Sequence, residues 1–238
     1  MAKATKKTVN QNTETEESLL SVVIPGIMIK NASVRIIGDT PLIVHAWSAK
    51  AKQMILDKQI KKATAGKEAK DPFRDFVESM YWITGQPELS EFSDEERALA
   101  FGKQPVNIAN FAAAKFGFPS CAFKASAIDA GYQQRVLEKK TTARGAMHIM
   151  GEFAVIEGFP TMREDMVRIG MGVADIRFRA EFQEWSTVLN IKFNANAISL
   201  EQIINLLNYG GFANGVGEWR PGKGGSNGTF HVDSAEFC

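Results

Sequence analysis

Hydrophobic and polar residues alternate in some stretches of the chain and follow a helical pattern in others. Alternation and short apolar runs predict strands within residues 29–47, 174–182, 184–194 and 228–232. Helical spacing and propensity predict helices within residues 48–69, 71–83 and 198–207, and within 106–140 with a break at residues 117–119. Strands that flank helices, with a strand closing the chain, predict an α+β fold in which helices cover one face of a largely antiparallel sheet.

Three helix starts carry local sequence signals. Ser48 is a candidate N-cap, and Asp71 stands directly before Pro72, which suits the first turn of a helix. Ser199 is followed three residues later by Gln202, which is capping-box spacing. We therefore expect helices to begin at these positions.

The chain has 238 residues, which suits a single domain. Residues 1–20 are polar and short of aromatic side chains, so we expect a disordered tail there and one domain over residues 21–238. Residues 84–104 are rich in Pro, Gly and acidic side chains and predict an excursion on the surface. Two cysteines, no signal-peptide pattern and no apolar run of membrane-spanning length predict a cytoplasmic protein that does not contact membranes.

The net charge is only +1, so overall charge does not indicate a nucleic-acid partner. The distribution is more informative, because basic side chains gather in residues 138–145, in residues 162–179 and around Arg220. Arg163 and Arg168 belong to the second group, where Glu164 and Asp165 separate them. A nearly neutral protein can therefore still carry a basic face.

Two arginines mark the strand expected at residues 174–182. Arg177 and Arg179 share one face of the strand, while Ile176 and Phe178 share the other, which we expect to be buried. The arginine face is either a solvated surface paired with acidic neighbours or a binding surface for phosphate groups.

The sequence GGFANGVGEWRPGKGGSNGTF, residues 210–230, contains eight glycines. It matches neither nucleotide-binding glycine motif, since Lys223 is followed by Gly224 and the loop follows a helix and precedes a strand. One interpretation is a loop that approaches a polyanion through exposed amides, with charge from Arg220 and Lys223 and with Trp219 stacked on a base. The other is a connection whose tryptophan is buried in the core.

No catalytic motif, metal-binding spacing or cofactor motif is present, and the three histidines stand far apart in sequence. The sequence therefore predicts a protein that is not an enzyme and needs no cofactor or metal.

Two stretches together carry a resemblance to a known family. GFPSCAFKASAIDA, residues 117–130, resembles the Pro-Ser-Lys element of the RAMP superfamily of CRISPR effector proteins, and residues 198–232 are similar to the helix, glycine-rich loop and final strand of those domains. The subgroup most similar is the crRNA-binding backbone subunits. The chain also looks similar to uncharacterised proteins of tailed bacteriophages and prophages.

The resemblance implies a ferredoxin-like, RNA-recognition-motif-like sheet with an inserted thumb, which falls here at residues 135–172. It implies binding of single-stranded RNA or DNA and head-to-tail assembly of copies along the strand in a bacterial host cell. The residues that would contact the strand are Lys124, Lys139, Lys140, Arg144, Arg163, Arg168, Arg177, Arg179, Trp219, Arg220 and Lys223.

Two alternatives stay open. One is a RAMP-type endoribonuclease in which His45 or His148 acts as general base. The other is a phage protein-binding module or inhibitor that has no affinity for nucleic acid.

Overall fold

The computed structural model describes residues 24–60, 69–169 and 172–238, so the tail expected at residues 1–20 lies outside the described residues. The strands are β1 (Ile29–Gly38), β2 (Leu42–Val44), β3 (Tyr81–Trp82), β4 (Phe116–Pro119), β5 (Met147–Ile149), β6 (Phe153–Glu157), β7 (Pro160–Ile169), β8 (Val173–Phe182), β9 (Ser186–Asn194) and β10 (Phe230–Phe237). The helices are α1 (Ala49–Gln59), α2 (Pro72–Glu78), α3 (Asp94–Ala100), α4 (Ala109–Ala112), α5 (Ser120–Gln133), α6 (Lys140–Ala146) and α7 (Leu200–Ala213), with short 3-10 helices η1 (Leu89–Glu91) and η2 (Pro221–Lys223).

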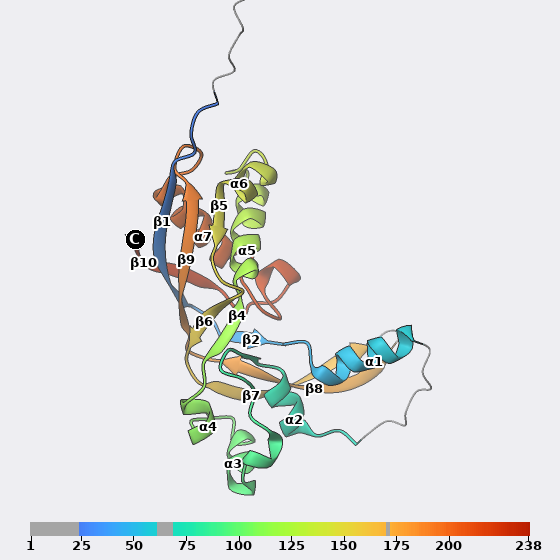
Figure 1. Cartoon of the computed structure of the whole chain (residues 1–238). Coiled ribbons are helices and arrows are strands. Elements are labelled where there is room, and N and C mark those ends of the chain that lie inside the picture. The colour runs from blue at the N-terminus through green and yellow to red at the C-terminus, as the bar shows by residue number, and fades with distance from the viewer. Residues whose placement is uncertain (1–23, 61–68, 170–171) are drawn as a thin grey trace, which may run out of the picture.

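The larger sheet contains a ferredoxin-like core. Its strands lie in the order β10-β1-β9-β6-β4-β3, with β5 also paired to β9, and every pairing is antiparallel. In chain order β1, α5, β5, β9, α7 and β10 form a βαββαβ unit with the spatial order 4-1-3-2. Helices α5 and α7 lie together against this sheet (Figure 1), and the Ser126 hydroxyl on α5 donates to the Gly210 carbonyl on α7 at 2.9 Å. The α+β prediction is confirmed.

Local signals place the helix starts as expected. The Asp71 carboxylate accepts from the first amides of α2, and Pro72 occupies the first turn. Ser199 and Gln202 form a reciprocal capping box at the start of α7. The predicted interruption at residues 117–119 is confirmed, because α4 ends at Ala112 and α5 begins only at Ser120. Residues 116–119 form a strand that was not predicted, β4, which pairs with β3 and β6.

Two long insertions interrupt the core, and together they build a second sheet. The first, between β1 and α5, supplies β2, and the second, between β5 and β9, supplies β7 and β8, so that the three strands lie in the order β2-β8-β7. Strands β7 and β8 form a long hairpin that projects from the body of the molecule (Figure 1). The segment expected as a thumb, residues 135–172, therefore contributes α6, β5 and β6 to the body and β7 to the hairpin. Residues 84–104 include η1 and α3 and bury Phe92 and Ala100.

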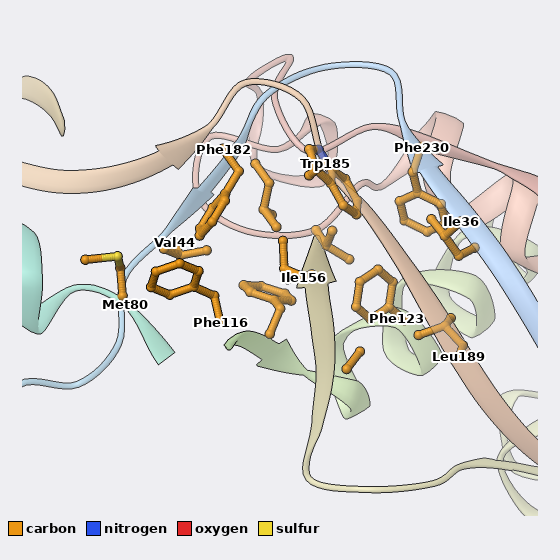
Figure 2. Packing of buried hydrophobic residues seen from close by; sticks show 14 of the residues in the cluster. Ile36, Val44, Met80, Phe116, Phe123, Ile156, Phe182, Trp185, Leu189 and Phe230 are labelled. Carbon is orange, nitrogen blue, oxygen red and sulfur yellow. The ribbon is translucent and has the colours of Figure 1, made fainter. Parts of the chain in front are cut away.

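One hydrophobic core joins the two sheets. Figure 2 shows Phe116 of β4 beside Phe182 of β8, with ring centroids 5.5 Å apart, and Trp185 beside Phe123 of α5 and Phe230 of β10. Burial of each phenylalanine side chain contributes about 2 kcal/mol to stability. The hairpin is thus anchored at its base while its tip stands free of the core.

Candidate nucleic-acid interface

Backbone hydrogen bonds hold the glycine-rich loop between α7 and β10 in its conformation. Nine amides donate to backbone carbonyls, namely those of Gly215, Val216, Glu218, Gly222, Lys223, Gly224, Gly225, Asn227 and Gly228. Within the described chain, the amides of Gly217, Trp219, Arg220 and Ser226 have no backbone acceptor. The expectation of a loop whose amides face outward is therefore corrected, because most of them stabilise the loop itself.

Glycine is required where the loop passes close to other backbone. Gly217 has φ +81°, and a Cβ there would lie 2.6 Å from the carbonyl oxygen of Ile43, the central residue of β2. Gly228 has φ +68°, and a Cβ there would overlap the Val216 carbonyl. The loop is thereby fixed against β2 and closed on itself.

Trp219 does not enter the core. Its side chain is 46% exposed, and its backbone adopts the left-handed region at φ +52°, which is unfavourable for a bulky residue. The next residue, Arg220, donates from its guanidinium to the Gly217 carbonyl at 2.9 Å, and Lys223 is exposed in η2. Of the two interpretations of Trp219, the buried plug is wrong.

A pocket of about 280 Å³ lies between the glycine loop and α5. We call it the glycine-loop pocket; it is lined by Ile43, His45, Tyr81, Phe118, Pro119, Ala122, Ala125, Ser126, Asp129, Asn214, Gly215, Val216, Gly217, Glu218 and Arg220. Among its polar side chains, only His45 and Arg220 are candidates by sequence. The other polar members come from α5, β3 and the loop itself, and only the fold brings them together.

A basic cluster lies beside this pocket, where α5 faces α6. Lys124 on α5 donates to the Arg144 carbonyl on α6 at 2.8 Å, and Lys140 contacts the Asp129 carboxylate at 2.8 Å. The Arg144 guanidinium lies 4.0 Å from Asp129. Partial burial, with the positive charge of Arg144, lowers the pKa of Lys124. Because Asp129 also lines the pocket, the cluster is continuous with it. Lys139, at the cap of α6, is exposed.

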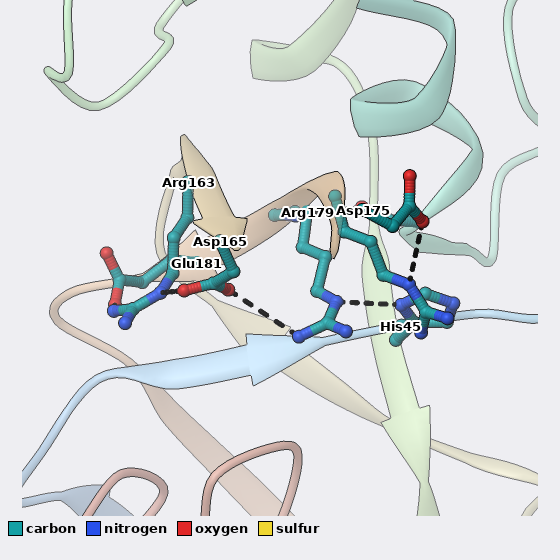
Figure 3. Close-up of polar contacts among 9 residues, drawn as sticks. His45, Arg163, Asp165, Asp175, Arg179 and Glu181 are labelled. Atoms are coloured by element: carbon teal, nitrogen blue, oxygen red, sulfur yellow. Dashed lines mark hydrogen bonds and ion pairs between the residues drawn. The ribbon is translucent and has the colours of Figure 1, made fainter. Parts of the chain in front are cut away.

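The hairpin arginines form a different network (Figure 3). Arg163 pairs with Asp165 at 2.9 Å and with Glu181 at 2.7 Å. Arg179 donates from Nε to His45 Nδ1 at 3.0 Å and lies 3.5 Å from Asp165. Residues 160–182 carry four basic and four acidic side chains, so this network has no net charge.

Arg177 pairs with a different carboxylate of the hairpin, that of Asp175. Its guanidinium lies 3.6 Å from the Asp175 carboxylate, which Lys70 also contacts at 2.9 Å. Arg168 is exposed on the other face of the hairpin, where it stands opposite Ala174. The hairpin arginines therefore do not form one basic surface.

The burial expected for one face of β8 is wrong for Ile176, whereas Phe178 on the same face packs against the core. Arg179 is 3% exposed, whereas Ile176, on the face expected to be buried, is 45% exposed. The reason is position along the hairpin: near its base both faces are covered, and toward its tip both meet solvent. Arg179 lies too deep for a strand on the surface to reach, and alternation alone does not report this depth.

The two histidines of the nuclease alternative do not come together. His45 follows β2 and is engaged by Arg179, while His148 is exposed on β5 in register with Lys192. Within residues 24–60, 69–169 and 172–238, no three His, Cys, Asp or Glu side chains gather as metal ligands. In the same residues, no helix combines the length and the apolar character that crossing a bilayer requires.

No protein-family model matches the chain, and no curated protein matches it. Among solved structures the chain is similar to Cmr6 from Pyrococcus furiosus, with a TM-score of 0.38 and 9% sequence identity over 87% of this chain and 100% of that chain.

Proposed function

We propose that the chain is a non-enzymatic protein that binds single-stranded RNA or DNA along the α5–α6 face and the glycine loop. The observation that carries the proposal is the basic cluster of Lys124, Lys140 and Arg144 beside a structured, glycine-rich pocket. The ferredoxin-like core agrees with the RAMP resemblance of the sequence, which implies the same class of partner.

Local charge supports this placement. Residues 124–144 carry five basic side chains against two acidic ones, whereas the β7–β8 hairpin is balanced. Contacts between basic side chains and phosphates supply most of the affinity of such proteins and make it depend on salt. The α5–α6 face therefore suits a phosphate backbone better than the hairpin does.

Trp219 supports a single-stranded partner over a duplex. An exposed indole held in a strained backbone conformation next to a cationic side chain, Arg220, is suited to stacking on an unpaired base. In a duplex the faces of the bases are covered by their neighbours, so this contact would be lost.

The proposal includes head-to-tail assembly of copies along the strand. The projecting hairpin supports it, because Met166 and Ile176 stand opposite each other near its tip and are 71% and 45% exposed. An apolar pair at the end of a projection fits a contact between different surfaces of successive copies. Light scattering with and without a long oligonucleotide tests it, and an unchanged particle stoichiometry of one protein per strand contradicts it.

Fluorescence anisotropy with labelled single-stranded DNA and RNA of equal length, titrated across salt, tests binding. The variants are Lys140→Ala/Arg144→Ala and Arg220→Ala/Lys223→Ala. The matched control, Lys103→Ala/Lys115→Ala, removes the same charge from exposed positions elsewhere. We expect each site variant to reduce the slope of log affinity against log salt by about 1.4, that is, about 0.7 per lost phosphate contact, and the control to leave it unchanged. Absence of binding at low salt, or an equal loss in the control, overturns the proposal.

A further inference from the structure

The glycine-loop pocket does not have the chemistry of a phosphate site. Its charged side chains are Asp129, Glu218 and Arg220, so its lining is acidic on balance while His45 is neutral. Most amides that would cradle a phosphate already donate within the loop. A phosphate group would meet two carboxylates there, which is unfavourable.

The two carboxylates differ in whether a hydrogen-bond donor already occupies them. Asp129 already accepts from Lys140 and faces Arg144. Glu218 is exposed at the rim, and within the described residues its carboxylate accepts no hydrogen bond. Its backbone is held against β2, because its own amide donates to the Ile43 carbonyl at 3.0 Å. Within the described residues, Glu218 thus brings to the pocket rim a carboxylate that no hydrogen-bond donor occupies.

Glu218 lines the same pocket as the aromatic side chains of Tyr81 and Phe118. Burial raises the pKa of Tyr81 and the negative charge of Glu218 raises it further. The same charge opposes the lowering of the His45 pKa that burial and Arg179 cause. Tyr81 packs against Phe118 with ring centroids 5.9 Å apart, so a rigid aromatic wall stands near the free carboxylate.

A small cavity that combines polar side chains with an aromatic wall and one free acceptor fits a planar ring that carries N–H donors. Proteins that recognise single strands hold unstacked bases in this way, by aromatic contact and by hydrogen bonds to the base edge. A carboxylate has two acceptor oxygens and no donor, so it selects an edge with adjacent donors. Guanine offers two, at N1 and at its exocyclic amino group.

We infer that the glycine-loop pocket receives one unstacked guanine of the bound strand, with Glu218 accepting hydrogen bonds from its N1–H and amino group. The inference rests on the proposed function. It adds a base preference at one position to binding that otherwise follows the backbone. Glu218 is the residue that determines this specificity, and Tyr81 supplies the surface on which the base lies.

The test measures anisotropy at fixed salt with 12-residue uridine oligonucleotides that carry a single central guanine, adenine or cytosine, beside uniform uridine. We expect the wild type to bind the guanine strand about tenfold more tightly than uniform uridine. Glu218→Gln replaces one acceptor oxygen by a donor at the same size. It should bring the two affinities within about twofold while retaining affinity for uniform uridine. Glu184→Gln, an exposed position elsewhere, is the matched control and should retain the preference.

The outcomes separate the two proposals. Equal binding of all four strands by the wild type, or a guanine preference that persists in Glu218→Gln, overturns the guanine inference and leaves the proposed function standing. Absence of binding to every strand here, together with absence of binding to the single-stranded DNA of the salt titration above, overturns the proposed function and the inference with it. A thermal melt of Glu218→Gln checks that the variant is folded, and Glu218→Asp, which keeps the charge on a shorter side chain, should retain part of the preference.

Discussion

The Nε of Arg179 donates a hydrogen bond to Nδ1 of His45 at 3.0 Å. Arginine stays protonated, so this contact requires Nδ1 to be the unprotonated nitrogen and places the hydrogen of a neutral ring on Nε2. With its acceptor nitrogen occupied, His45 is poorly suited to take a proton from a ribose hydroxyl. The geometry thus favours a positioning role for His45 at the rim of the glycine-loop pocket.

The pH dependence of stability should report on this contact. Burial, together with the charge of Arg179, lowers the pKa of His45 below its ordinary 6.5. The unfolded chain then binds the proton more readily, so the contribution of His45 is fully present above pH 6.5 and is lost as the pH falls through the folded-state pKa. We expect the urea midpoint of His45→Asn to fall less than that of the wild type between pH 7.5 and 5.5, because the Asn oxygen accepts from Arg179 without taking up a proton. Parallel curves would contradict the assigned contact.

Arg179 should be more important to stability than Arg177, its neighbour on the same face. We expect Arg179→Met to cost about 2 kcal/mol. This is below the usual cost of breaking a buried ion pair, because Arg163 continues to neutralise Asp165. Arg177→Met, at a half-exposed pair with Asp175, should cost less than about 1 kcal/mol. Urea unfolding compares the two, and equal costs would show that the network is not buried as described.

The glycine loop offers a matched pair of substitutions. Gly224→Ala changes a residue with φ +81° and open space around it, so we expect a loss of about 1 kcal/mol from backbone strain alone. Gly228→Ala adds an overlap with the Val216 carbonyl and should cost about 3 kcal/mol or more. Thermal melts measure both. Similar losses would mean that the loop closes less tightly than its hydrogen bonds indicate.

Trp219→Gly separates binding from stability. Removal of an exposed side chain from a left-handed backbone conformation should leave the free energy of unfolding within about 1 kcal/mol of wild type. Loss of base stacking should weaken binding of single strands about tenfold. The check is an unfolding curve beside an anisotropy titration. A large loss of stability, or unchanged affinity, would remove Trp219 from the interface.

Local rules explain what the sequence predicts well. The caps at Asp71 and Ser199 depend only on the next three residues, and the alternation in β9 reports directly that one face of that strand is buried. These features were predicted because neighbours along the chain determine them.

Features set by distant segments were not predicted. The burial of Arg179 depends on how far along the hairpin it lies and on His45, which comes from another part of the chain. The membership of Asp129, Tyr81 and Glu218 in one pocket depends on the packing of α5, β3 and the loop. Glu218 carried one local hint, since it stands between Gly217 and Trp219, two residues with positive φ. Glycine suggests such a conformation in a sequence, but tryptophan does not.

The pairing of β2 with β8 bears on how the chain is made. Leu42 pairs with Phe182, and β1 pairs with β9 and β10. During synthesis from the N-terminus, the first two strands therefore leave the ribosome long before any of their partners exist. Native pairing of β1 and β2 must wait until most of the chain has emerged, and contacts of such sequence separation form slowly. During that interval the edges of β1 and β2 are exposed and can pair with other chains. We therefore expect the yield of folded protein to depend on chaperone supply and on translation speed.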